Sequence, residues 1–160
     1  MPGKLLLETK RQAYAIFTRL PKRLRKRVVR AITPNYTVGA VVLLRDEKER
    51  LLMLRQPPGL GWSLPGGLLD RREEAVEAAA RELREETGVR LALDRFTAAT
   101  PAALVNPRTQ QVDVVFTATA DPDTVLRLDP VEVIEADWYP LDALPPLTRP
   151  TANLLAKVTF

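Results

Sequence analysis

The stretch PGGLLDRREEAVEAAARELREETGV, residues 65–89, contains the strongest helix signal in the chain. Its second half is filled with Ala, Glu, Arg and Leu, which are good helix formers, and it predicts a helix over residues 71–87. Apolar side chains recur at the spacing of one helix face, at Val76, Ala79, Ala80 and Leu83. Asp70 and Glu73 are a candidate capping pair at the start of this helix, and Gly88 is a candidate C-terminal cap.

Three carboxylates, Glu82, Glu85 and Glu86, lie within five residues of this predicted helix. Like charges at this spacing repel by about 0.2–0.5 kcal/mol per pair on an exposed helix. At about 100° per residue, the three side chains fall on one side and can converge on one point. A hard divalent cation offsets such repulsion and prefers oxygen ligands, and the preceding glycines let a backbone carbonyl approach. The alternative is a solvated helix face, with Arg81 and Arg84 as ion-pair partners.

The chain has 160 residues and contains neither cysteine nor histidine. This composition excludes disulfides, a thiol nucleophile, a catalytic triad that needs imidazole, and a Cys/His zinc site. A metal ion must therefore sit among oxygens, which favours Mg²⁺, Mn²⁺ or Ca²⁺. No apolar run is long enough to span a bilayer and no signal-peptide pattern is present, so we expect a cytoplasmic protein.

The remaining sequence predicts strands combined with a few helices. Residues 4–32 are predicted to be helical, with a break at Pro21. Extended segments are predicted at 36–46, 51–56, 62–67, 89–93, 110–120 and 132–140, and a last helix at 149–158. The first two strands are expected to form a hairpin. This mixture predicts an α/β (α+β) sandwich around a mixed β-sheet.

The glycine-to-valine part of residues 65–89 resembles the signature of the Nudix hydrolase family. That signature is Gly, five residues, Glu, seven residues, Arg–Glu, an aliphatic residue, any residue, Glu–Glu, any residue, Gly and an aliphatic residue. The chain supplies every fixed position, at Gly67, Glu73, Arg81, Glu82, Leu83, Glu85, Glu86, Gly88 and Val89. The resemblance implies a Nudix-like α/β/α sandwich over residues 34–160, preceded by a basic helical N-terminal arm at residues 1–33.

The resemblance also implies roles for single residues. Glu82, Glu85 and Glu86, with the carbonyl of Gly66, are similar to the family's metal ligands. Glu73 and Arg81 resemble the family's structural ion pair, which ties the loop to the helix. Arg72 stands where many members have Gly, and we expect a local change in loop conformation that leaves the ligands intact.

The reaction implied is the Mg²⁺-dependent hydrolysis of a diphosphate bond, with Mn²⁺ as a second candidate cofactor. The substrate would be a nucleoside diphosphate linked to another moiety, with ADP-ribose or nucleotide-sugar types first and nucleoside triphosphates second. Carboxylates that could act on the attacking water are Glu82 and Glu85 in the cluster, and Glu132 or Glu135 on the strand at 132–140. Two alternatives are a nucleotide-sensing module without activity and a pyrophosphohydrolase that acts on RNA 5′ ends.

Four residues outside the signature are candidates for substrate binding. Arg45 and Arg55 end the first two strands and could hold phosphate oxygens, although strand-end arginines often serve only solubility. Trp62, beside the glycine loop, could stack on a base, although aromatic residues are more often part of a core. Asp113 lies in an otherwise apolar strand and could point into a cleft.

The N-terminal arm is strongly basic. Residues 1–33 contain ten Lys/Arg and one acid, Glu8, and apolar residues at Leu20, Leu24, Val28 and Ile32 form a stripe. We expect this stripe to cover the domain or a partner subunit, which would make a homodimer. The charge could instead attract polyanions such as RNA, or an anionic membrane surface. Nucleic acid is not the expected partner, because no aromatic residues alternate with the basic ones.

Overall fold

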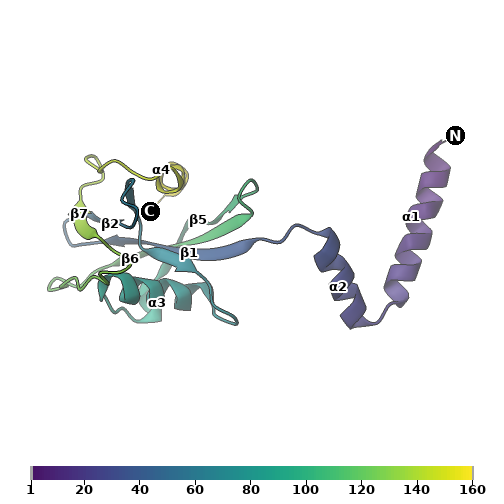
Figure 1. Cartoon of the computed structure of the whole chain (residues 1–160), viewed down its shortest axis with the longest axis horizontal. Coiled ribbons are helices and arrows are strands. Elements are labelled where there is room, and N and C mark those ends of the chain that lie inside the picture. The colour runs from purple at the N-terminus through teal and green to yellow at the C-terminus, as the bar shows by residue number, and fades with distance from the viewer. Residues whose placement is uncertain (1, 160) are drawn as a thin grey trace. The chain divides into compact units, whose positions relative to one another are not determined.

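The structure is a computed structural model that describes residues 2–159, and the surroundings of side chains from residue 7 onward. It divides into two compact units, residues 1–36 and 37–160. The first unit consists of the helices α1 (Pro2–Arg19) and α2 (Lys22–Ile32) (Figure 1). Pro21 stands between them in an extended conformation, which confirms the predicted break. Among the described residues, no helix combines the length and the apolarity needed to cross a bilayer.

The second unit is built on a seven-stranded mixed sheet with the order β3-β2-β1-β6-β5, in which β4 also pairs with β1 and β7 with β2. Its strands are β1 (Thr37–Arg45), β2 (Leu51–Arg55), β3 (Trp62–Ser63), β4 (Gly66–Leu68), β5 (Thr97–Asn106), β6 (Gln111–Thr119) and β7 (Glu135–Tyr139). The pair β1–β6 is parallel, whereas β1–β2 is antiparallel as the predicted hairpin requires. The fold is therefore an α+β arrangement around a mixed sheet, as predicted.

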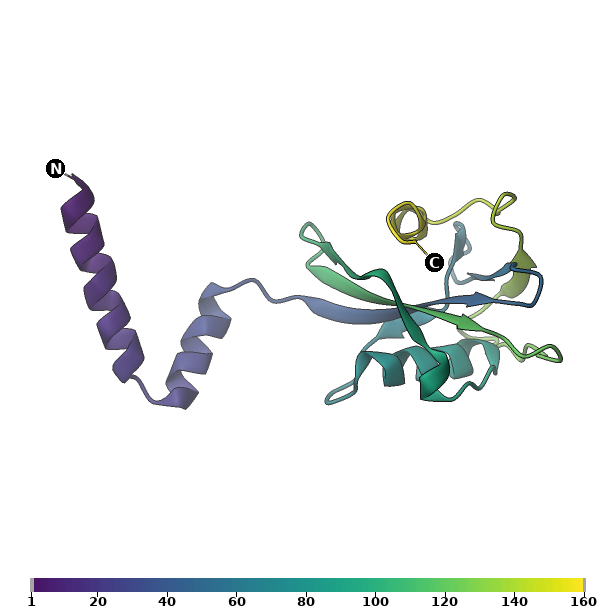
Figure 2. The same cartoon turned by 180° about the vertical axis from the view of Figure 1, so that it is seen from behind.

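Alternation along the central strands gives the sheet two apolar faces. In β1, Val42 and Leu44 belong to one buried cluster, whereas Leu43 belongs to the other. The helix α3 (Ala75–Thr87) covers the first face with Ala79 and Leu83 among other residues. The helix α4 (Arg149–Leu155) contributes Leu154 to the cluster on the opposite face. Figures 1 and 2 show α3 and α4 on opposite sides of the sheet, which is the predicted α/β/α sandwich.

The helix α3 begins four residues later than the sequence predicted. Glu74 occupies the cap position, and its backbone N–H donates to the carboxylate of Glu77 at 2.8 Å. The carboxylate of Glu73, predicted to cap this helix, instead accepts from the N–H of Asp70 at 2.7 Å and pairs with Arg81. The predicted end is confirmed, because Gly88 caps the helix with a φ of 75°.

One predicted strand is absent and one observed strand was not predicted. Residues 89–92 are irregular and lead into the 3₁₀ turn η1 (Leu93–Arg95), although Val89 is buried in the core. The strand β5 follows, with a register shift between Ala98 and Ala103 where Pro101 cannot donate a ladder hydrogen bond. This strand is rich in alanine and contains Pro101, so it has few of the β-branched residues by which a strand is predicted from sequence.

Arg72, in the loop before α3, adopts a φ of 70°, which an L-residue reaches at a cost of about 1–2 kcal/mol. Replacing it with Gly removes this strain but adds about 0.5–1 kcal/mol of backbone entropy loss. We therefore expect Arg72→Gly to leave the free energy of unfolding unchanged or to raise it by up to about 1 kcal/mol in urea titrations. The matched control is Arg71→Gly, at an exposed neighbour with negative φ, which should lower stability by about 0.5–1 kcal/mol. Equal losses in both variants would show that the loop is unstrained.

Candidate active site

Glu86 is the only charged residue in the buried set of the described chain, with 2% of its surface exposed. Its Oε2 accepts a hydrogen bond from the backbone N–H of Gly66 at 2.9 Å. Its Oε1 accepts from the amide Nε2 of Gln56, whose own Oε1 accepts from the hydroxyl of Ser63 at 2.9 Å. Both donors to the carboxylate are neutral, so the negative charge is hydrogen-bonded but has no cation among these partners.

The electrostatic surroundings of Glu86 disfavour its charge. Burial is the main cause that raises the pKa of Glu86 from 4.5 to about 8. The hydrogen bond from the N–H of Gly66 acts in the opposite direction, because it stabilises the charged form. The carboxylates of Glu82 and Glu132 raise this pKa further, because both put negative charge nearby. A divalent cation bound among these oxygens would offset the repulsion, so the donor set fits a hard metal ion.

The two glycines of β4 let the carboxylate helix and the sheet approach each other closely. A Cβ on Gly66 would overlap the carbonyl oxygen of Ala40 and lie 2.8 Å from the Cα of Val41, in the neighbouring strand β1. A Cβ on Gly67 would overlap the carboxylate of Glu82. The Gly–Gly pair therefore creates the space in which Glu82 lies against β4.

Arg81 links the loop before α3 to the acidic cluster. Its Nε donates to Glu73 at 2.8 Å, and its Nη2 donates to the same carboxylate and to the carbonyl of Leu68, each at 3.0 Å. Its Nη1 reaches Glu82 at 2.8 Å and Glu85 at 3.3 Å. The hydrogen bond with Glu73 raises the pKa of Arg81, and its counterpart lowers the pKa of Glu73. The ion pair predicted from the signature is thus present, and it extends into the cluster.

The three cluster carboxylates do not converge on one point in this structure. Glu86 turns toward Gly66, whereas Glu82 is paired with Arg81, and the half-exposed Glu85 is paired with both Arg81 and Arg84. In the described part of the chain, no three acidic side chains are grouped so that they could hold a metal ion as they lie. Their role as metal ligands, with Gly66, stays a prediction.

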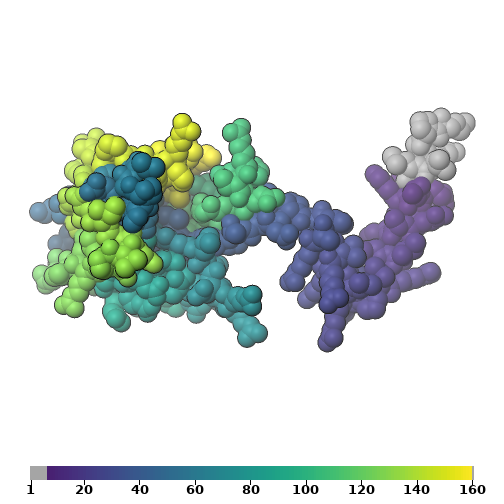
Figure 3. All heavy atoms as spheres, in the orientation of Figure 1, coloured from purple at the N-terminus to yellow at the C-terminus, as the bar shows by residue number. Residues whose placement is uncertain are grey.

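Glu132 and Glu135, predicted to share a strand, lie in different elements. Strand β7 begins at Glu135, which pairs with Arg55 of β2 at 2.7 Å. Glu132 lies in the preceding turn, where its N–H donates to the carbonyl of Asp129 at 3.2 Å. The N–H of Asp129 in turn donates to the carbonyl of Glu86 at 3.3 Å, so this turn is attached to the end of α3. Figure 3 shows the turn beside the loop at residues 57–61.

Three of the four predicted substrate contacts are engaged within the protein, and one of them is Arg55 through its ion pair with Glu135. Arg45 pairs with Glu49 at 2.6 Å at the tip of the β1–β2 hairpin. Trp62 is buried and packs edge-on against Tyr139, with ring centroids 5.1 Å apart. This packing is that of a core residue, and it leaves little of the indole ring for a base to stack on.

Asp113 lines a cavity of about 470 Å³ between the β5–β6 hairpin and α4. Its Oδ1 accepts from the amide of Gln111 at 2.7 Å. The same oxygen and the carbonyl oxygen of Gly67 lie 3.2 and 3.1 Å from the position of a Cβ on Gly39, so Asp113 and the β4 glycines adjoin one residue of β1. Cationic side chains also line this cavity, namely Arg108, Arg149 and Lys157.

The sequence patterns did not indicate these three cations, nor Gln56 and Ser63. The cations come from a hairpin and a helix about 40 residues apart in the chain, so no local spacing joins them. Gln56 and Ser63 belong to no charge pattern, and the pairing of β2 with β3 brings Ser63 to Gln56, which in turn donates to Glu86.

Comparison with known proteins places this geometry in one family. The model of the NUDIX domain matches residues 35–158. The NAD-capped RNA hydrolase NudC of Photorhabdus laumondii is 30% identical over 126 residues, which are 79% of this chain and 45% of that protein. The CMP-5'-(N-acetyl-N-hydroxy-3-aminopropyl)phosphonate hydrolase of Streptomyces rubellomurinus is 45% identical over 56 residues, which are 32% of this chain and 27% of that protein.

A solved structure of a Nudix hydrolase shares this fold. The crystal structure of a MutT NUDIX hydrolase from Burkholderia pseudomallei aligns with a TM-score of 0.63 and 29% identity, over 78% of this chain and 99% of that one. By contrast, the chain spans less than half the length of the first curated relatives that it matches, from 27% to 45%. The match over residues 35–158 and the shared fold show that this chain belongs to the Nudix family.

Proposed function

We propose that the chain hydrolyses the diphosphate bond of a nucleoside diphosphate linked to another moiety, with a divalent metal ion as cofactor. The observation that carries this proposal is the buried carboxylate of Glu86, which has neutral donors on one side and the carboxylates of Glu82 and Glu132 nearby. A purely structural helix face would have no reason to bury this charge among like charges.

Glu82, Glu85, Glu86 and the carbonyl of Gly66 would hold the metal ion. Because these ligands are all oxygens, we propose Mg²⁺ first and Mn²⁺ second. When bound, such an ion would polarise the phosphate oxygens and lower the pKa of a coordinated water. Arg81, which pairs with Glu82 and Glu85 here, would keep the loop attached to α3 through Glu73 while those two carboxylates turn toward the ion.

Glu132 is the side chain best placed to take the proton from the attacking water. Glu135 is paired with Arg55, and Glu85 is paired with Arg81 and Arg84. Glu132 is exposed, and its charge acts on Glu86 from the turn attached to the end of α3. A base must be free to accept the proton of the water, and the exposed Glu132 meets this condition better than the paired carboxylates Glu85 and Glu135.

We propose that the second moiety of the substrate occupies the cavity lined by Asp113, Arg108, Arg149 and Lys157. ADP-ribose and nucleotide sugars are the first candidates and nucleoside triphosphates the second. The similarity to the NAD-capped RNA hydrolase NudC favours one further candidate, the diphosphate at the 5′ end of a capped RNA. A sensing module without activity is disfavoured, because Glu73, Glu82, Glu85 and Glu86 are all retained.

The proposed function is tested by assaying nucleoside monophosphate release from a substrate panel, with Mg²⁺, with Mn²⁺ and with a chelator. The panel contains ADP-ribose, UDP-glucose, NADH, GTP and an NAD-capped RNA. We expect turnover of at least one compound that depends on the metal ion, and a loss of more than about 100-fold in Glu86→Gln with the fold retained. Unchanged turnover in Glu86→Gln would remove the assigned metal site, and no turnover of any compound would favour the sensing module.

The same variant should gain stability when no metal is present. Because folding raises the pKa of Glu86 from 4.5 to about 8, the stability contributed by its proton is fully present below pH 4.5 and is lost as the pH rises through 8. At neutral pH we expect Glu86→Gln to raise the free energy of unfolding in chelator by roughly 1–3 kcal/mol, with the difference vanishing near pH 4.5. Urea titrations across this pH range measure it. A variant that is less stable than the parent at neutral pH would contradict this expectation.

The role of Glu132 is tested against a matched carboxylate. We expect Glu132→Gln to lower kcat by about 100-fold or more and to flatten the acidic limb of the pH–rate profile, with little change in the Kd for Mn²⁺. Glu135→Gln, the control on β7, should change kcat by less than about tenfold, because that carboxylate is held by Arg55. A larger loss of kcat in Glu135→Gln than in Glu132→Gln would assign the proton transfer to Glu135.

A further inference from the structure

The first unit has a charge quite unlike that of the rest of the chain. Residues 1–36 contain ten Lys/Arg and one acidic residue, Glu8. Six of the ten fall within residues 22–30 of α2, at Lys22, Arg23, Arg25, Lys26, Arg27 and Arg30. No acidic residue lies between Glu8 and Asp46, so these cations have no local counter-charge in the sequence.

The same unit exposes apolar side chains. The helix α2 has no buried residue, and Ile32 is 76% exposed. Large apolar side chains are exposed on both helices, at Leu7, Tyr14, Ile16, Leu24, Val29 and Ile32. Isolated exposed apolar residues are ordinary, but this number within one small unit indicates a binding surface.

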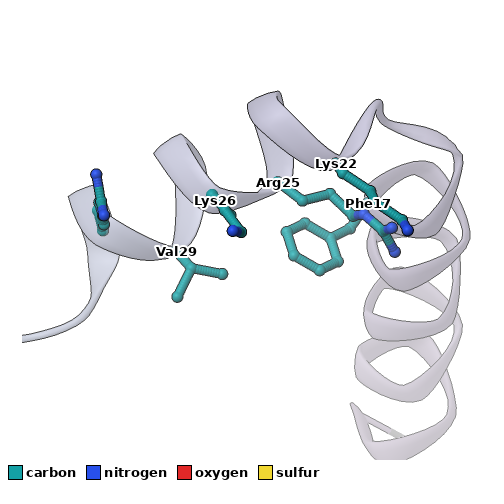
Figure 4. A pocket seen from close by; sticks show the side chains of 6 residues that line it. Phe17, Lys22, Arg25, Lys26 and Val29 are labelled. Atoms are coloured by element: carbon teal, nitrogen blue, oxygen red, sulfur yellow. The ribbon is translucent and has the colours of Figure 1, made fainter.

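Cationic and apolar side chains together line a pocket beside the turn between α1 and α2. Its volume is about 470 Å³. Figure 4 shows the ring of Phe17 beneath α2, with Lys22 and Arg25 beside it and Val29 and Lys26 facing the same side. A second cavity of about 590 Å³ in this unit is lined mainly by apolar side chains, including Tyr14, Leu20 and Val28. The unit therefore has apolar hollows with cationic rims.

We propose that this unit, residues 1–36, binds the surface of an anionic lipid bilayer. An amphipathic basic helix lies in the membrane interface with its apolar residues among the acyl chains and its cations at the headgroup phosphates. Phe17 and Val29 supply the apolar part, and Arg25, Lys26 and Arg30 supply the contacts to the headgroups. A bilayer surface is the partner that satisfies both features at once.

Two other partners fit less well. An RNA backbone would neutralise the cations but would leave the exposed aliphatic side chains of α2, such as Leu24 and Ile32, in water. A second copy of the unit would cover apolar surface but would bring two strongly positive units together, and this repulsion opposes self-association.

The test is co-sedimentation of the full chain with vesicles. Phosphatidylcholine vesicles are compared with vesicles of phosphatidylcholine mixed with phosphatidylglycerol, at low and at near-physiological salt. We expect binding to the mixed vesicles alone, weaker as salt increases because the cations are screened. Hydrolysis of a soluble substrate is followed in parallel, so that failure of the proposed enzyme and failure of the lipid proposal are seen separately.

Two double variants separate charge from apolar contact. Arg25→Gln with Arg30→Gln removes two cations, and Phe17→Gln with Val29→Gln removes the apolar part without changing the charge. Each pair should weaken binding to the mixed vesicles by about tenfold or more. The matched control is Arg71→Gln with Arg90→Gln, which removes the same charge from exposed positions outside the unit and should bind like the parent. Because Gln is a good helix former, circular dichroism should be unchanged in all three.

Four results would overturn the proposal. The first is no binding to either vesicle, and the second is equal binding to both. The third is tighter binding to a single-stranded RNA than to the vesicles, with equal RNA affinity for the parent and the Phe17/Val29 variant. This result would assign the surface to nucleic acid. The fourth is a dimer in lipid-free sedimentation velocity that the Phe17/Val29 variant dissociates, which would assign it to a second copy.

Discussion

The carboxylate of Glu86 is buried at the end of α3, where a backbone N–H and an amide side chain, both neutral, donate to it. Burying a charge in this way is costly unless its surroundings are arranged for it. The neighbouring structure holds the carboxylate in place without neutralising its charge. The glycines of β4 bring the strand within reach of α3, and the β2–β3 pairing places Ser63 where it holds Gln56, which donates to the carboxylate. The turn at Glu132 is attached to the same helix end.

The two faces of the sheet determine where the acidic cluster and the cavity at Asp113 lie. Period-two alternation in β1 and β2 gives α3 one apolar face and α4 the other, so the acidic cluster is fixed by one layer and the cavity at Asp113 by the opposite layer. Gly39 of β1 lies between them, next to both Asp113 and the carbonyl of Gly67. Asp113 of β6 and Gly67 of β4, two strands that flank β1 in the same sheet, thus both adjoin the point at which β1 has no side chain.

The sequence predicted the parts of this structure that depend on local periodicity or on a fixed spacing. The apolar stripe of α3 and its end at Gly88 follow from spacing within one segment, whereas the Glu73–Arg81 pair was implied by the resemblance to the family signature. Features that depend on pairing between distant segments were missed or misplaced. Strand β5 has few β-branched residues and is held by β6, and Glu132 lies in a turn because β7 pairs with β2 only from Glu135 onward. Likewise, the choice between base stacking and core packing for Trp62 depends on its contact with Tyr139, which lies far away in the sequence.

Arg81 contacts three carboxylates and one carbonyl, so the acidic helix already has a counter-ion of its own. An incoming divalent ion would therefore compete with a tethered guanidinium for Glu82 and Glu85, but not for Glu86. The tether has two effects on such an exchange: it lets the helix form before any ion arrives, and it lowers the apparent affinity by the strength of the contacts that must be released. The occupancy of the site would then depend on the free concentration of the ion over a range set by the contacts of Arg81 with Glu82 and Glu85 and of Arg84 with Glu85.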